Sequence, residues 1–254
     1  MKLPLHEYIL LVAQIAALAC LVVRLVAAGL VREYRFFFSF ILLELLEGLI
    51  PFTVPYGDVY GWAFVVSASL KLGFYVLIVF ELYSVLLRDL AGIARMARRY
   101  SMLALAIAVL LSVLVVTALP LPRNPLRRLF YVEIPILSAL VLFMLLIAAF
   151  LAYYPVALQR NAIVYASGYV TYFISKTTLL FLSLRLGSAS LRIFSPIFLG
   201  LEVCCLIFLT IFLSRAGERR TVSVGSKWSP PDKQQQVLLR LRQLNDSLLR
   251  ARPK

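Results

Sequence analysis

Several ionisable side chains lie inside long apolar stretches of this sequence, where a charge is costly. Glu44 and Glu47 are one helical turn apart, and Lys71 falls at a similar depth in the next apolar stretch. A lysine, arginine or aspartate at the centre of a bilayer costs about 2.5–3.5 kcal/mol on insertion scales. We therefore expect an ion pair between Lys71 and one of the two glutamates, and the second carboxyl is then protonated or hydrogen-bonded.

A second group of polar residues lies in the last two apolar stretches. Lys176 and Glu202 form a possible second ion pair. Tyr165, Tyr169, Tyr172 and Lys176 are spaced i, i+4, i+7 and i+11, which places them on one face of a helix. A lysine on a face of tyrosines in apolar surroundings predicts a lined cavity.

Two interpretations of these residues stay open. Ionisable residues in membrane spans usually face the bundle interior or a water-filled cavity, which favours a ligand or proton site. Polar side chains also join neighbouring helices, at about 0.6 kcal/mol per hydrogen bond, and tyrosines near span ends act as interfacial anchors. The candidate ligand-binding set consists of Glu44, Glu47, Lys71, Tyr165, Tyr169, Tyr172, Lys176 and Glu202.

Two further ionisable residues fall near the ends of apolar stretches and need no function. Arg24 can reach the membrane surface, so we expect it to be an anchor. Glu81 lies near the same surface, where it could meet Arg32 or Arg35.

Composition indicates that a bilayer surrounds these residues. The chain of 254 residues is 62% hydrophobic, with a mean hydropathy of +0.92, whereas soluble domains are about 45–50% apolar. A crossing helix needs about 20 apolar residues, and seven stretches qualify. They are 7–31, 36–54, 61–86, 100–119, 129–153, 162–184 and 194–213. The predicted fold is an all-α bundle of about seven transmembrane helices, because barrel strands are shorter and less continuously apolar.

The distribution of lysine and arginine predicts the orientation, because cytoplasmic loops carry the excess. One side holds Arg32, Arg35, Arg88, Arg95, Arg98, Arg99, Arg160 and the basic tail. The other side holds Lys2, Arg123, Arg127, Arg128, Arg185 and Arg192. We therefore expect the amino terminus outside and the carboxyl terminus in the cytoplasm. The net charge of +14 follows from these flanking residues, so nucleic-acid binding is not expected.

The carboxyl-terminal segment differs in composition from the rest of the chain. We expect a membrane domain over 1–214 and a basic cytoplasmic tail over 215–254. Within the tail, apolar residues recur at helical spacing over 233–252, with arginines between them. This pattern predicts a basic amphipathic helix suited to an anionic lipid surface or a protein partner, the alternative being a solvated tail.

The chain lacks the residue patterns that common kinds of catalysis and cofactor binding require. His6 is the single histidine, which argues against paired-histidine haem ligation, zinc-protease motifs and serine–histidine catalysis. No phosphate-binding glycine loop occurs, and the last apolar stretch holds no lysine for a retinal Schiff base. Cys20, Cys204 and Cys205 are expected to be buried free thiols. We expect no catalytic residue, metal or cofactor.

Three short motifs resemble those of a known protein family. His6-Glu7 opens the first apolar stretch, Arg35 and three phenylalanines enter the second, and Glu81-Leu82-Tyr83 closes the third before a basic linker. In these features the chain resembles a family of uncharacterised seven-span bacterial membrane proteins. The resemblance covers the whole membrane region and implies that fold in the bacterial inner membrane. The family has no established activity, so it implies no function.

Three functions are consistent with these patterns. The leading hypothesis is a non-enzymatic sensing or small-ligand-binding membrane protein, since the tail is too short to be a signalling enzyme itself. The second is a small transporter or proton-coupled permease, because intramembrane carboxylates and lysines also suit that class. The third is an assembly or scaffold subunit whose charges only pack helices.

Overall fold

In the computed structural model, the residues that can be described are 5–53, 58–86, 99–100, 102–103, 106–107, 110, 114, 125–153, 157–186, 188–219, 221–223, 239, 243 and 247. They are almost entirely helical, so the predicted all-α class is confirmed. The long helices are α1 (Leu5–Ala27), α2 (Arg35–Thr53), α3 (Asp58–Leu86), α5 (Pro125–Tyr153), α6 (Arg160–Leu186) and α7 (Ser188–Phe212).

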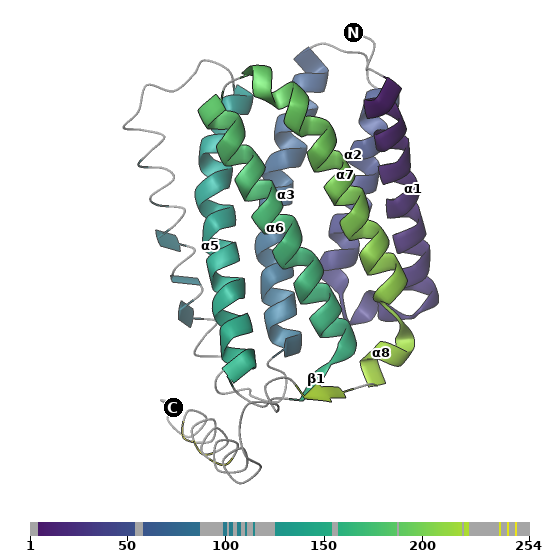
Figure 1. Ribbon diagram of the computed structural model, residues 1–254, viewed down its shortest axis with the longest axis vertical. Helices are drawn as coiled ribbons and strands as arrows, with labels where there is room; N and C mark the ends of the chain where they lie inside the picture. The colour runs from purple at the N-terminus through teal and green to yellow at the C-terminus, as the bar shows by residue number, and fades with distance from the viewer. Residues whose placement is uncertain are drawn as a thin grey trace.

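The six long helices stand side by side as a bundle (Figure 1). α1 contacts α2 and α7, α3 contacts α2 and α5, and α6 contacts α5 and α7, so the six close into a ring. α3 also contacts α6 across the ring. Residues from several different helices can therefore meet in the interior.

Three of the described helices contain a segment long and apolar enough to cross a membrane. These segments are Tyr8–Ala27 in α1, Gly61–Leu86 in α3 and Tyr131–Ala149 in α5. α7 has a shorter apolar segment, Pro196–Phe212. The expected stretch 100–119 lies outside the described residues, apart from a few helical positions.

Large apolar side chains also cover the outside of the bundle. Val23, Leu46, Trp62, Leu142 and Ile211 are all exposed, and they lie on five different helices. Exposed apolar surface as extensive as this is unusual on soluble monomers. A lipid environment would cover it.

The first helix ends earlier than expected. α1 stops at Ala27 instead of Val31, because Gly29 adopts a left-handed conformation with φ of 69°. Glycine tolerates this conformation without a steric penalty, and it commonly ends helices. A short 3-10 turn, η1 (Leu30–Arg32), then leads into α2.

One end of the bundle carries small elements that the apolar pattern did not predict. Strand β1 (Ala157–Gln159) pairs antiparallel with strand β2 (Thr221–Ser223), and helix α8 (Arg215–Arg219) lies beside them (Figure 1). Residues assigned to the tail from position 215 thus pack on the bundle up to Ser223. The expected amphipathic helix 233–252 lies outside the described residues, except for single helical positions at 239, 243 and 247.

Candidate functional site

Lys71 of α3 forms an ion pair with both glutamates of α2. Its Nζ lies 2.9 Å from Glu44 Oε2 and 2.8 Å from Glu47 Oε2, and it donates a hydrogen bond to Glu44. The expected pairing is confirmed, and the choice between the two glutamates is resolved as contact with both. One lysine therefore faces two carboxyls in the interior.

The second predicted ion pair is wrong. Lys176 Nζ lies 2.5 Å from Oε1 of Glu133 on α5, and Glu202 pairs instead with the amide of Gln14 on α1. The physical reason is that Lys176 meets Glu133 of α5 and the Tyr75 hydroxyl of α3, and these two contacts occupy its ammonium group. Sequence reasoning missed Glu133, although a carboxylate inside an apolar stretch was the same signal that selected the other glutamates.

A hydrogen-bonded chain continues from Lys176 toward the centre of the bundle. Lys176 donates to the Tyr75 hydroxyl at 2.6 Å, and the hydroxyls of Tyr75 and Tyr172 are 3.0 Å apart. The ammonium also lies 4.6 Å from the centroid of the Tyr75 ring. The chain thus runs from Glu133 through Lys176 and Tyr75 to Tyr172. Tyr75 was missed because a single tyrosine in an apolar stretch carries no pattern.

Tyr165 and Tyr169 lie in a cluster of aromatic rings that meet mostly edge to face. Their centroids are 5.0 Å apart, and the Phe37 ring of α2 contacts both, at 4.9 Å and 5.6 Å. The Tyr165 hydroxyl is buried and lacks a hydrogen-bond partner among the described residues. Tyr165 therefore contributes packing, whereas Tyr169 also borders the open space described next.

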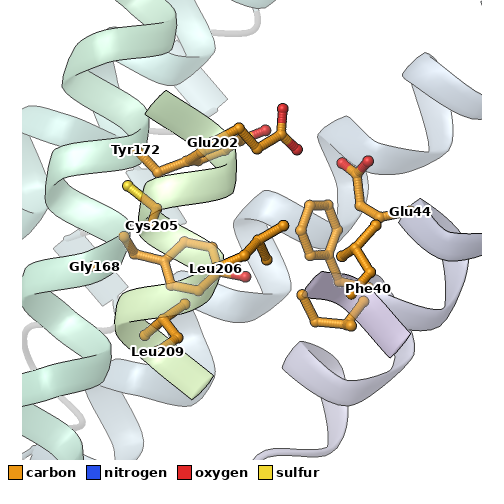
Figure 2. Close-up of a pocket in the computed structure, with 11 residues that line it drawn as sticks. Phe40, Glu44, Gly168, Tyr172, Glu202, Cys205, Leu206 and Leu209 are labelled. Atoms are coloured by element: carbon orange, nitrogen blue, oxygen red, sulfur yellow. The ribbon is translucent and has the colours of Figure 1, made fainter. Parts of the chain in front are cut away.

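A cavity lies between α2, α6 and α7, with one side chain from α1 (Figure 2). Its volume of about 30 Å³ holds about two water molecules, since one water needs roughly 10–15 Å³ on this measure. The lining consists of Leu18, Phe40, Ile41, Glu44, Gly168, Tyr169, Tyr172, Glu202, Cys205, Leu206 and Leu209. The predicted residues Glu44, Tyr169, Tyr172 and Glu202 therefore come together there, whereas Glu47, Lys71, Tyr165 and Lys176 do not line it.

Two carboxyl groups face each other across one end of this cavity. Figure 2 shows Glu44 and Glu202 directed toward the same space from opposite walls. Glu44 is 5% exposed and Glu202 is 8% exposed. Glu44 Oε1 is buried and accepts no hydrogen bond from the part of the chain that the structure describes. The site thus has acceptor capacity that its own residues leave unused.

Gly168 allows the two walls of the cavity to approach. A Cβ at this position of α6 would lie 2.8 Å from Leu209 Cδ2 of α7. A side chain here would push α6 and α7 apart or narrow the cavity. The width of the site therefore depends on this glycine.

Arg24 and Glu81 each cap the end of a neighbouring helix. Glu81 accepts the backbone N–H groups of Phe36 at 2.9 Å and Phe37 at 3.0 Å, at the start of α2, with Arg35 nearby. Arg24 donates to the carbonyl of Leu213 at 3.0 Å, just after α7 ends. A carboxylate at a helix start and a cation at a helix end both satisfy orphan backbone groups and the helix dipole. These contacts are more specific than the surface roles expected for both residues.

A polar cluster fixes α8 to the same end of the bundle, and we call it the latch: Tyr34, Asn161, Ser214 and Glu218. The Tyr34 hydroxyl donates to Glu218 Oε1 at 2.8 Å, and Asn161 Nδ2 donates to the same oxygen at 2.9 Å. Asn161, which is fully buried, also donates to the Ser214 carbonyl at 2.7 Å. Burial and the adjacent Glu218 carboxylate raise the pKa of Tyr34 well above its usual value, so this phenol is a neutral donor.

Cys20, Cys204 and Cys205 are free thiols, as expected, but Cys20 and Cys204 are exposed on the outside of the bundle. Within the described segments, no three histidine, cysteine, aspartate or glutamate side chains are grouped to hold a metal ion. Comparisons with protein-family models, with curated proteins and with solved structures find no match to this chain.

Proposed function

We propose that this protein is a non-enzymatic membrane sensor that binds a small ligand in the cavity between Glu44 and Glu202. The observation that carries the proposal is the buried Glu44 carboxyl, which faces the Glu202 carboxyl across an open space and has one oxygen without a hydrogen-bond partner among the described residues. Buried polar groups are nearly always hydrogen-bonded, so an unpaired acceptor that borders a cavity favours binding of a hydrogen-bond donor there.

The proposal includes the topology of about seven spans in a bacterial inner membrane, with the amino terminus outside. Arg24, Arg32, Arg35, Arg160 and Arg215 all belong to the bundle end that carries α8, which supports a cytoplasmic position for that end. The span over 100–119 and membership of the seven-span family remain part of the proposal.

A route from the cavity to the tail supports sensing. α7 lines the cavity through Glu202, Cys205 and Leu206, and then runs directly into the latch at Ser214 and Glu218. The latch also holds the α1–α2 turn and the start of α6, whose helices form the other walls. A ligand that draws α7 toward α2 would therefore change strain in the latch, and so the position of the tail for a protein or anionic-lipid partner.

Cysteine accessibility tests whether the cavity is a reachable site. In a Cys20→Ser and Cys204→Ser background, Ag⁺, a thiol-reactive ion smaller than methylammonium, should modify Cys205 of the protein in nanodiscs, because this residue lines the cavity. The matched control restores Cys204 and replaces Cys205 by serine. The Cys204 thiol is exposed on the outside of the bundle, where lipid covers it, so it should react with the reagent at least tenfold more slowly than Cys205. Equal rates at the two positions would contradict an accessible cavity.

A second candidate function is proton-coupled transport, and the hydrogen-bonded chain from Glu133 to Tyr172 favours it. Such a chain could move a proton between α5 and the cavity through Lys176 and Tyr75. Proteoliposomes separate the two functions. Solute-driven proton flux that is lost in Tyr75→Phe would support transport, whereas a bound ligand without flux would support sensing.

A further inference from the structure

The interior holds more negative than positive charge around the cavity. The carboxyl groups are those of Glu44, Glu47, Glu133 and Glu202, and the cations among the described residues are Lys71 and Lys176. Each lysine can balance one carboxylate. An unbalanced buried carboxylate costs several kcal/mol unless a proton or another cation joins it.

The unbalanced charge is concentrated at the cavity. Lys71 lies beside Glu44 Oε2, whereas Glu44 Oε1 has no partner in the described structure. Figure 2 shows the Glu44 carboxyl directed toward the open space. Glu202 on the opposite wall has the neutral Gln14 amide as its partner. Both carboxyls are more than nine-tenths buried. The empty space between them is therefore the place where an added positive charge would gain most.

The rest of the lining selects the kind of cation. Three aromatic rings border the cavity, those of Phe40, Tyr169 and Tyr172, and the other neighbours are mainly aliphatic. Aromatic faces attract ammonium groups and replace part of their hydration. A metal ion such as Ca²⁺ needs about six to eight oxygen ligands, which this lining does not supply. The lining thus suits a nitrogen cation better than a hydrated metal ion.

We infer that the cavity between Glu44 and Glu202 binds a small primary ammonium ion, and this inference rests on the proposed function. The ammonium donates to Glu44 Oε1 and to the Glu202 carboxyl, and its remaining surface packs against the aromatic rings. The cavity of about 30 Å³ limits the ligand to the size of ammonium or methylammonium. A tetramethylammonium ion is too large and has no N–H to donate.

Titration calorimetry of the full-length protein in nanodiscs tests this site, with methylammonium chloride as the probe at constant ionic strength. The wild-type protein should give a saturable isotherm, and NaCl or tetramethylammonium chloride should not. Glu202→Gln and Glu44→Gln should each weaken the association at least tenfold, because each removes one carboxylate that faces the ion. Glu202→Asp, which keeps the charge, should weaken it less than Glu202→Gln.

Glu47→Gln is the matched control, because it removes a carboxylate one turn from Glu44 that does not line the cavity. This variant should bind methylammonium within about twofold of wild type. A wild-type protein that gives no saturable isotherm, or a Glu202→Gln variant that binds like wild type while unfolding at the wild-type temperature, overturns the inference.

Two measurements separate failure of this inference from failure of the proposed function. Native mass spectrometry of the protein released from nanodiscs detects any other small molecule that stays bound. Another bound species lost in Glu202→Gln, without methylammonium binding, would reject the ammonium ion and keep the sensor. An unreactive Cys205 together with no bound species would reject both.

Discussion

Tyr34 and Glu218 are 184 positions apart in the sequence, yet the Tyr34 hydroxyl donates a 2.8 Å hydrogen bond to the Glu218 carboxylate. The contact joins the turn between α1 and α2 to the segment that follows α7. Asn161 of α6 shares the same carboxylate oxygen. The α1–α2 turn and α6 are thus both tied to the start of the tail at one point, so a change in the latch would change the position of the tail.

Removing the Tyr34 hydroxyl should loosen the latch and leave the bundle intact. A hydrogen bond to a charged group contributes about 1.5–3 kcal/mol, so Tyr34→Phe should raise amide exchange over 215–223 by roughly tenfold or more. Hydrogen–deuterium exchange with mass spectrometry measures this directly, and exchange in α3 should stay unchanged.

Tyr83→Phe is the control for this experiment. The Tyr83 hydroxyl is buried and has no hydrogen-bond partner in the described part of the chain. Its removal deletes the same atom without breaking a bond, so exchange over 215–223 should match wild type. Equal effects of the two variants would show that the Tyr34 contact does not hold the latch.

A side chain at Gly217 should also open the latch. A Cβ there would collide with the Asn161 side chain, which is fully buried and cannot move away freely. We expect Gly217→Ala to destabilise the protein by about 1–3 kcal/mol, as overpacking usually does. Gly200→Ala in α7 is the matched control, because nothing lies within 4 Å of its added Cβ. Thermal unfolding of both variants in detergent checks the difference, and a Gly217→Ala midpoint equal to that of Gly200→Ala would contradict the packing.

The helical class and one ion pair could be predicted because both depend on local patterns. Apolar stretches of sufficient length define the helices, and α2 and α3 follow each other in the chain and pack together. Glu44 and Glu47 lie one turn apart on the face of α2 that meets α3, so two carboxyls at similar depth were available to Lys71.

The partner of Lys176 and the latch depend on information that no local pattern holds. Lys176 and Glu202 were paired because they lie at a similar depth in the bundle. The rotation of a helix about its axis decides which neighbour a side chain meets, and Lys176 meets Glu133. The latch needs the α1–α2 turn to lie beside the end of α7, which follows only from closure of the ring. The two short strands are likewise too short to produce an alternating pattern.

Double-mutant cycles should confirm which carboxylate Lys176 needs. Breaking one partner of a buried ion pair costs about 3–5 kcal/mol, because the other charge is left uncompensated. Lys176→Met and Glu133→Leu should therefore be less destabilising together than their single effects add up to. The cycle of Lys176→Met with Glu202→Leu should be close to additive. Denaturant unfolding in mixed micelles measures both cycles, and the reverse order of coupling would contradict the observed pair.

Gly168 should control the size of the cavity. Gly168→Ala places a Cβ 2.8 Å from the Leu209 side chain, so α6 and α7 must separate or Leu209 must move into the cavity. We expect the modification rate of Cys205 to change by about threefold or more, and stability to fall by about 1–3 kcal/mol. Gly73→Ala in α3 is the control, since its added Cβ meets nothing within 4 Å. Unchanged Cys205 reactivity in Gly168→Ala would show that this contact does not set the cavity width.

A final cycle separates a binding role from a packing role for the charges beside the cavity. Lys71→Met leaves Glu44 and Glu47 without their cation and should cost about 3–5 kcal/mol. Adding Glu47→Leu should recover part of that loss, because Glu44 is then the single carboxylate left at the pair.

If the charges only pack helices, a triple variant with Glu44→Leu should be at least as stable as wild type and should keep the latch closed in hydrogen exchange. If Glu44 holds a ligand, the triple variant regains stability but loses ligand-dependent protection of 215–223. The decisive measurement is that protection with and without methylammonium, and an unaltered ligand response in the triple variant would remove Glu44 from the site.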